Sequence, residues 1–178
     1  MIRLEDVIRK TCEKLARKLP TWIITVAEDD PYLARHYIFQ KDWIPGSLKP
    51  YLRWVPSVFV HEFQRGDSDR EYHNHPWKTS FSLILAGGYT EERLKRVRDG
   101  FEVVRKTFRP GMINTIRAED FHRVALLDGK TTWTLFVAGE RTGMMWGFLD
   151  VDTKEFVTWK EHLRRREGRC VNGYAKPA

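Results

Sequence analysis

Three histidines in two short segments, Tyr72-His-Asn-His-Pro-Trp77 and Glu119-Asp-Phe-His122, decide how the rest of the chain is interpreted. Residues two apart in an extended strand point to the same face, so His73 and His75 can present two imidazoles to one point. His122 begins a run in which the next residues of the same parity are apolar, so its side chain is expected to point inward. The pattern predicts that the three imidazoles meet inside a small β-barrel, where they would hold one metal ion.

The residues on both sides of these segments are typical of short β-strands. From about Thr21 onward, runs rich in Val, Ile, Phe, Trp and Thr alternate with turn signals such as Gly-Asp, Asp-Gly and Pro-Gly. Short strands with turns close together favour an antiparallel sandwich or barrel over a parallel sheet with crossover helices. The predicted strands are 22–27, 57–64, 79–86, 88–97, 101–108, 112–117, 121–127, 131–138, 143–149 and 155–159.

Two turns are predicted to close β-hairpins. Asp99-Gly100 separates two alternating charged runs, and Asp128-Gly129 joins two runs rich in apolar residues. Asp-Gly between alternating runs is among the best short-range hairpin signals. The segment 28–56, by contrast, is interrupted repeatedly by proline, and we expect no long regular element there.

A helix is predicted at each end of the chain. Residues 2–19 have an apolar stripe at spacings of three and four that should pack on the barrel, and Pro20 ends the helix. A second, short and basic helix is expected at about 160–169. The 178 residues are then one domain, with a packing helix (1–20), a β-barrel (21–160) and a basic C-terminal helix and tail (161–178). The stripe consists of Leu4, Val7, Ile8, Cys12, Leu15 and Leu19.

Composition limits the setting and the partners. The chain has no apolar run close to the ~20 residues of a membrane span and no secretory signal, and two cysteines make no disulfide framework, so we expect a cytoplasmic protein without a membrane partner. A net charge of +7 favours an anionic partner, and we expect a small anionic molecule. Nucleic acid is permitted by the charge but has no binding motif here to support it. A homodimer is an oligomeric state that the sequence allows.

The two histidine segments resemble the two motifs of the cupin superfamily. In the first, His73-Asn-His75 is followed by Gly87 at the family's spacing, and Ser80 stands where the family has a glutamate ligand. In the second, Gly111 and His122 have the expected spacing. Arg117, Glu119 and Leu126 replace the Pro, Gly and Asn of the usual second motif.

The resemblance implies a mainly β fold, the cupin-type antiparallel β-barrel (double-stranded β-helix, or jelly roll). The run Arg70-Glu-Tyr-His-Asn-His-Pro-Trp77 further resembles a group of small bacterial and phage cupins. By this resemblance His73, His75 and His122 are ligands of one divalent metal. Imidazole suits several metals: Fe²⁺ is our first expectation, with Zn²⁺, Mn²⁺ or Ni²⁺ as alternatives.

A centre of three histidines without the carboxylate resembles the iron site of thiol dioxygenases. We therefore expect an oxygen-dependent non-haem iron dioxygenase that acts on a small anionic metabolite. One alternative is a non-redox metal-dependent isomerase, hydrolase or lyase. The other is a non-catalytic ligand-binding or regulatory cupin, whose metal is structural or whose site is vestigial.

Further residues are candidates for catalysis or substrate binding. Ser80, Arg70 and Tyr89 are the catalytic candidates, the arginine as an anion clamp and the tyrosine as an acid or base. His36 and His162 are expected at the surface. The substrate-binding candidates are His61, which alternates with two phenylalanines, and Trp77, Arg117 and Trp133.

Overall fold

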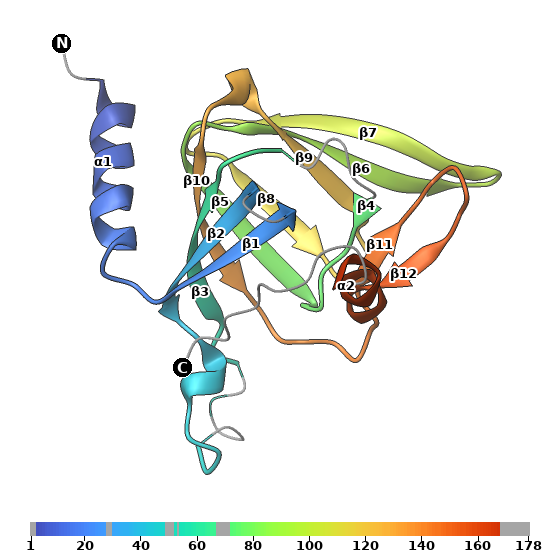
Figure 1. Cartoon of the computed structure of the whole chain (residues 1–178), viewed down its shortest axis with the longest axis horizontal. Coiled ribbons are helices and arrows are strands. Elements are labelled where there is room, and N and C mark those ends of the chain that lie inside the picture. The colour runs from blue at the N-terminus through green and yellow to red at the C-terminus, as the bar shows by residue number, and fades with distance from the viewer. Residues whose placement is uncertain (1–2, 28–29, 49–51, 53, 67–71, 168–178) are drawn as a thin grey trace.

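The protein is built from two antiparallel β-sheets that face each other, with the N-terminal helix on the outside of the first sheet and the C-terminal helix beside the second (Figure 1). The computed structural model describes residues 3–27, 30–48, 52, 54–66 and 72–167. The first sheet has the order β1-β2-β3-β10-β5-β8 and the second β12-β11-β4-β9-β6-β7. The sheets pack together through Ile84 of one and Tyr89, Phe108 and Val124 of the other. The mainly β, jelly-roll prediction is confirmed.

The strands lie close to their predicted positions. The first sheet contains β1 (Thr21–Ala27), β2 (Asp30–Phe39), β3 (Ser57–Phe63), β5 (Thr79–Ala86), β8 (Ile113–Arg117) and β10 (Thr132–Ala138). The second contains β4 (Tyr72–His73), β6 (Tyr89–Val97), β7 (Gly100–Phe108), β9 (His122–Leu126), β11 (Gly147–Leu149) and β12 (Phe156–Thr158). The helices are α1 (Leu4–Ala16) and α2 (Trp159–Glu167). None of the helices in the described ranges is long and apolar enough to cross a membrane.

One of the two predicted hairpins is present and the other is wrong. β6 and β7 pair from Tyr89↔Phe108 to Val97↔Gly100, around Asp99-Gly100. Asp128 and Gly129 do adopt the positive φ angles that the pattern predicts, 52° and 63°. Their flanking strands nevertheless belong to different sheets, because β9 pairs with β4 and β6 whereas β10 pairs with β3 and β5. The Asp-Gly signal reports local backbone conformation, and here that turn crosses between sheets.

The expectation of an irregular segment at 28–56 is also wrong, because β2 occupies residues 30–39. Its single proline, Pro31, lies near the start of the strand, where it is tolerated. β2 pairs with β1 on one side and with β3 on the other, so it is an internal strand of the sheet. The sequence of β2 does not show the usual alternation of apolar and polar residues, because the polar residues Arg35 and His36 occupy two positions that the fold covers.

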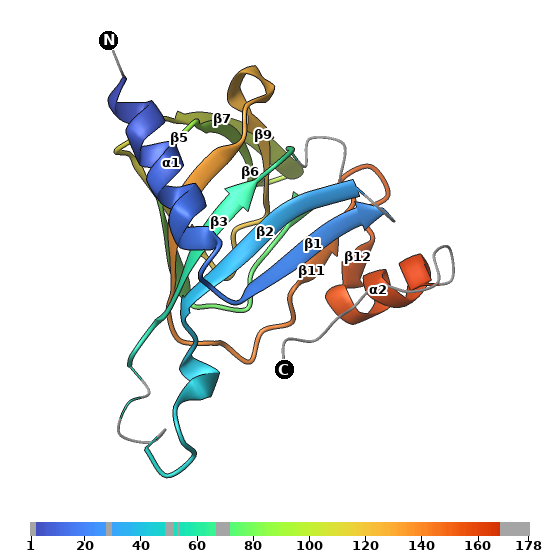
Figure 2. The ribbon, with the colours of Figure 1, turned by 60° about the vertical axis from the view of Figure 1, so that its left-hand side comes forward.

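Helix α1 lies along the outside of the first sheet, as Figure 2 shows, but its buried face differs from the predicted stripe. Ile8, Cys12 and Ala16, four residues apart, pack on Val60, Ala86 and Trp133 of the sheet. Leu4 and Leu15 are 74% and 40% exposed, so their predicted burial is wrong. The helix itself is confirmed, with Pro20 just beyond its last turn.

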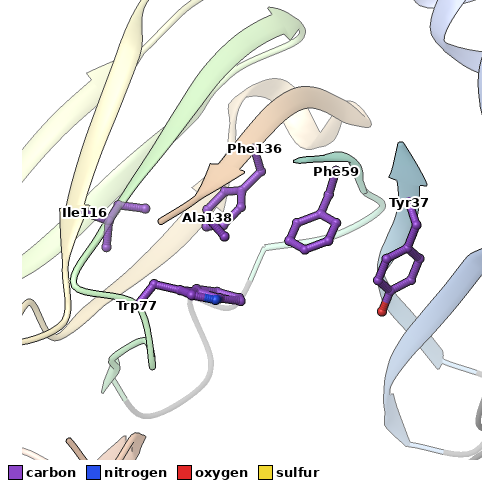
Figure 3. Packing of buried hydrophobic residues seen from close by; sticks show 6 residues of the cluster. All are labelled: Tyr37, Phe59, Trp77, Ile116, Phe136 and Ala138. Atoms are coloured by element: carbon purple, nitrogen blue, oxygen red, sulfur yellow. The ribbon is translucent and has the colours of Figure 1, made fainter. Parts of the chain in front are cut away.

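The interior next to the histidine segments is an aromatic layer. Phe59 of β3, Phe136 of β10 and Trp77 point toward one another, with Tyr37 of β2 beside them (Figure 3). Phe59 alternates with the outward-facing Val60, and Phe136 with Leu135, as expected for strands covered on both faces. This layer separates the sheet under α1 from the histidine cluster.

Candidate metal centre

Backbone pairing brings two of the three histidines together and chain continuity adds the third. His73 of β4 is the residue opposite His122 of β9, and His75 follows two residues later. One nitrogen of each imidazole lies within 4.8 Å of a nitrogen of each of the others. The Nε2 atoms of His75 and His122 are 2.9 Å apart. The structure thus assembles the three residues that the sequence pattern grouped.

The spacing of these nitrogen atoms suits a shared ion. Metal–imidazole bonds of about 2.0–2.1 Å place two ligand nitrogens about 2.9 Å apart at a right angle and about 3.4 Å apart at the tetrahedral angle. The observed 2.9 Å between His75 and His122 falls in this interval. Imidazole nitrogens are suitable ligands for Fe, Zn, Ni and Cu.

Asn74 anchors the backbone between the first two histidines. Its side chain is 1% exposed, and its amide donates to the carbonyl of Ala118 at 3.0 Å and accepts from the N–H of Gly147 at 2.8 Å. The Asn74 N–H also donates to the Gly147 carbonyl. Because β4 itself ends at His73, these bonds are what keep His75 in place beyond the strand.

Glu91 of β6, which the sequence analysis missed, orients His122. A carboxylate oxygen of Glu91 lies 2.6 Å from Nδ1 of His122, and both side chains are at most 4% exposed. A hydrogen on Nδ1 that is donated to this carboxylate leaves the lone pair on Nε2, the nitrogen that faces His75. A carboxylate behind a histidine in this way is the usual arrangement around metal-binding imidazoles.

The Glu91 carboxylate is itself held ionised by a polar network. Asn114 donates to it at 2.8 Å and Arg93 at 2.9 Å, and Arg93 also binds Asp120. Burial alone would raise the pKa of Glu91, but the hydrogen bonds from His122 and Asn114 and the charge of Arg93 lower it to about 2. Glu91 lies in a run in which most residues are charged. It is two residues after the buried Tyr89 and so on the same face of the strand, and this was the only sequence signal that could have distinguished it from the solvent-facing charges.

His75 is held neutral by its surroundings. Burial lowers its pKa well below 6.5, and the neighbouring His122, His73, Arg35 and His61 lower it further. Trp77 stacks on its ring at a centroid distance of 5.7 Å, and Phe136 is 6.1 Å away. A neutral imidazole in an apolar enclosure is in the protonation state that metal ligation requires.

The structure places two of the three catalytic candidates, Ser80 and Tyr89, in the barrel interior. Ser80 of β5 is fully buried on the inward face, and its Oγ has no hydrogen-bond partner within the described part of the chain. Tyr89 is a packed core residue: Asn114 donates to its hydroxyl at 3.2 Å, and burial raises its pKa to about 12, which keeps the phenol protonated at neutral pH. An acid–base role for Tyr89 is therefore unsupported. Arg70 lies outside the described residues.

Of the substrate-binding candidates, two lie inside the barrel and two do not. Trp77 stacks on His75, and His61 is 3% exposed inside the barrel, where its Nε2 accepts a hydrogen bond from Nε of Arg35 at 3.0 Å. Trp133 instead faces α1 on the outer side of the sheet, so its assignment to a pocket is wrong. The side chain of Arg117 is exposed, away from the aromatic layer.

Of the two histidines expected at the surface, His36 is buried and His162 is partly exposed. His36 is 6% exposed, 2.7 Å from the hydroxyl of Thr21 and stacked on Trp133. His162 of α2 is partly covered, and its ring stacks on Phe148 with a centroid distance of 4.0 Å. The burial of His36 depends on which strands lie beside β2, which sequence pattern alone does not reveal.

Comparisons with known proteins identify the fold. No family model and no curated protein matches the sequence. Among solved structures, the chain is similar to recombinant oxalate oxidase in complex with glycolate, at 16% identity and a TM-score of 0.50 over 70% of this chain and 59% of that one. It is similar to vicilin from hazelnut, Corylus avellana, at 10% identity and a TM-score of 0.50 over 66% of this chain and 32% of that one. Fe(II)-HppE with the alternative substrate (S)-1-HPP gives 11% identity and 0.49, over 69% and 57%.

The chain spans between a third and three fifths of the length of these matched structures. At such low identity the likeness concerns the fold, and that fold is the jelly roll of cupins.

Proposed function

We propose that the protein is a mononuclear metal-dependent cupin enzyme that acts on a small anionic metabolite. The observation that carries this proposal is the cluster of His73, His75 and His122 inside the barrel, with His122 backed by the Glu91 carboxylate. The carboxylate fixes which nitrogen of His122 faces the cluster, as expected for a metal ligand. The three imidazoles would hold the ion, and Glu91 would hold His122 in the required tautomer.

The charge of the ligand set argues for an anionic substrate. Three neutral imidazoles leave both charges of a divalent ion uncompensated, since the family's glutamate position is occupied by Ser80. Glu91 binds the far nitrogen of His122, so its charge is separated from the ion by the ring. Fewer than four protein ligands leave positions open, and a carboxylate, thiolate or phosphate oxygen is the natural occupant.

Within this class, we propose an oxygen-dependent non-haem iron dioxygenase. The support is the ligand set of three histidines, which resembles that of thiol dioxygenases and leaves room for substrate and O₂. A bound Fe²⁺ would supply the redox chemistry, while the protein supplies the apolar enclosure of Trp77 and Phe136 that limits water. A non-redox metalloenzyme and a ligand-binding cupin are the competing outcomes of the test.

The test begins with metal content. Untagged protein, stripped with chelator and reloaded with Fe²⁺, Zn²⁺, Mn²⁺ or Ni²⁺ in turn, should bind about one ion per chain, and the Fe²⁺ form should consume O₂ with small anionic thiols or acids. Turnover by the Zn²⁺ form without O₂ uptake would favour the non-redox alternative. Failure to retain any of the four ions would overturn the proposal.

Ser80→Glu separates an enzyme from a protein with a structural metal. A fourth carboxylate ligand should hold or increase metal content while it occupies a position that substrate or O₂ needs, so turnover should fall. For a structural metal, the fourth ligand would simply raise the melting temperature. Ser82→Glu, two residues along the same inward face, is the control for burying a glutamate.

A further inference from the structure

Arg35 is a half-buried cation that has no carboxylate partner among the residues the structure describes. It lies on the inward face of β2, and its guanidinium is 5.0 Å from the ring centre of Phe59, 5.7 Å from that of Trp77 and 5.8 Å from that of Trp22. Its Nε–H donates to His61, and the hydroxyl of Tyr37 is a second partner. Among the residues that the structure describes, no carboxylate lies within ion-pair distance of it.

A guanidinium in this position is costly to the folded protein unless an anion accompanies it. Burying a charge without an opposite charge costs several kcal/mol, and contacts with aromatic faces offset only part of that cost. The interior charge of Glu91, by comparison, is matched by Arg93. Within the described residues Arg35 has no such match, so an anion from outside the chain is a suitable counter-ion for it.

His61 orients Arg35 from inside the barrel. Because its Nε2 accepts the hydrogen bond from Arg35, its hydrogen is on Nδ1. That Nδ1 is buried and has no partner within the described residues, although the side chain is only 3% exposed. This Nδ1 points away from Arg35 and His61 does not line the cavity beside Arg35, so His61 orients the guanidinium, whose other N–H groups can donate to an oxyanion.

A cavity of about 140 Å³ adjoins Arg35 at this end of the barrel. Its apolar walls are the rings of Trp22, Phe59 and Trp77, and Tyr37 closes one side. Three cationic residues line it, Arg35, Lys41 and Arg141, against one acidic residue, Asp42, which accepts a hydrogen bond from Gln40. The balance of charge and the aromatic walls suit a small anion that carries an apolar group.

Trp77 connects this region with the histidine cluster. Arg35 lies over its ring, and His75 stacks on it. Arg35 is also near enough for its charge to lower the pKa of His75. An anion bound at Arg35 would therefore lie about one aromatic ring from the candidate metal ligands.

We propose that Arg35 binds the carboxylate or phosphate group of the substrate, and that the cavity between Trp22, Phe59 and Trp77 takes its apolar part. The connection to metal chemistry rests on the proposed function, but recognition of the anion does not. Arg35 is then the residue that selects charged over neutral ligands. The sequence analysis missed it because β2 was expected to be irregular.

Calorimetry on the metal-free full chain tests the proposal with benzoate, phenyl phosphate and the neutral isostere benzamide. Benzoate or phenyl phosphate should bind at least about tenfold more tightly than benzamide, and whichever anion binds better identifies the acid group of the substrate. Arg35→Met should weaken anion binding about 10- to 100-fold, the usual effect of losing a hydrogen bond to a charged group. Arg117→Met removes the same charge from an exposed position and should leave binding unchanged.

Thermal unfolding distinguishes recognition from a structural role. Without ligand, Arg35→Met should melt at the same temperature as the parent or higher, because an uncompensated charge is removed, and only the parent should be stabilised by added anion. Equal affinity for benzoate and benzamide on the parent protein would overturn the proposal without any variant. So would unchanged anion binding in Arg35→Met or an equal loss in Arg117→Met.

The same measurements on His122→Ala separate this proposal from the metal proposal. Anion binding that persists in a variant that has lost its metal supports the Arg35 site on its own. If the parent binds no metal yet prefers benzoate, the proposed function fails and the anion site stands. If the parent binds metal but does not prefer benzoate over benzamide, the anion-site proposal fails and the proposed function stands.

Discussion

The barrel interior has two sides that treat buried charge in opposite ways. On the side of β6 and β9, His122 is backed by Glu91, and Glu91 by Arg93 and Asn114. On the side of β2 and β3, Arg35 and His61 bind each other among aromatic rings, with no carboxylate partner in the described ranges. The first side is neutralised by the chain's own residues, whereas the second is where we propose that an external anion binds. Such a contrast is expected of a binding site in which one wall has fixed protein contacts and the opposite wall binds and releases a ligand.

The largest expected effect is loss of metal from the fixed side. His122→Ala should reduce metal content from about one ion per chain to near zero and leave the β structure intact, since one of three ligands is lost while the core remains. Metal analysis together with circular dichroism measures both. His36→Ala is the control: this buried histidine lies outside the cluster, and its loss should not change metal content. Equal metal retention by both variants would contradict the assignment.

The second expectation is acid destabilisation of the metal-free protein through Glu91. Its folded pKa of about 2, against the ordinary 4.5, means that its contribution to stability is complete above pH 4.5 and is lost as the pH falls toward 2. A shift of this size corresponds to about 3 kcal/mol.

Urea unfolding at pH 5, 4 and 3 measures this contribution. The difference in stability between the parent and Glu91→Gln should shrink as the pH falls. A difference that stays constant across this range would show that the carboxylate is not held ionised by its neighbours.

The third expectation concerns metal affinity. Glu91→Gln should weaken metal binding about 10- to 100-fold, because the amide holds His122 less firmly in the required tautomer than the carboxylate does. Glu92→Gln is matched to it in charge, size and strand, but Glu92 pairs with Arg105 and Arg123 and does not contact His122. Competition with a chromogenic chelator gives both affinities. A similar loss in both variants would mean that the effect is one of net charge.

The smallest effect is expected at the end of the fixed network. Tyr89→Phe removes only the hydroxyl that accepts from Asn114, so it should cost about 1 kcal/mol of stability and leave metal affinity and turnover unchanged. Denaturant titration and steady-state rates measure the two properties. A fall in turnover greater than the loss of folded protein explains would support a catalytic role for Tyr89.

Local sequence signals predicted the parts of the molecule that depend on local chemistry. The His-x-His pattern, the turn at Asp99-Gly100 and the helix ended by Pro20 are each set within a few residues. Glu91 and Arg35 could not be found this way, because their burial depends on which strands lie beside them. Trp133 was assigned to the pocket for the same reason: the sequence does not show that α1 covers the face of β10 on which Trp133 lies.

The shortness of β4 has a consequence for how the site opens. This strand has two residues and meets β9 at one residue pair, His73↔His122, which is also a pair of candidate ligands. Segments held by few contacts open first in native-state fluctuations. Any opening that separates β4 from β9 also separates His73 from His122, so release of an ion and local unfolding are one event. Bound metal should then slow amide hydrogen exchange at these two strands more than elsewhere, and the rate of metal exchange should follow the rate of that opening.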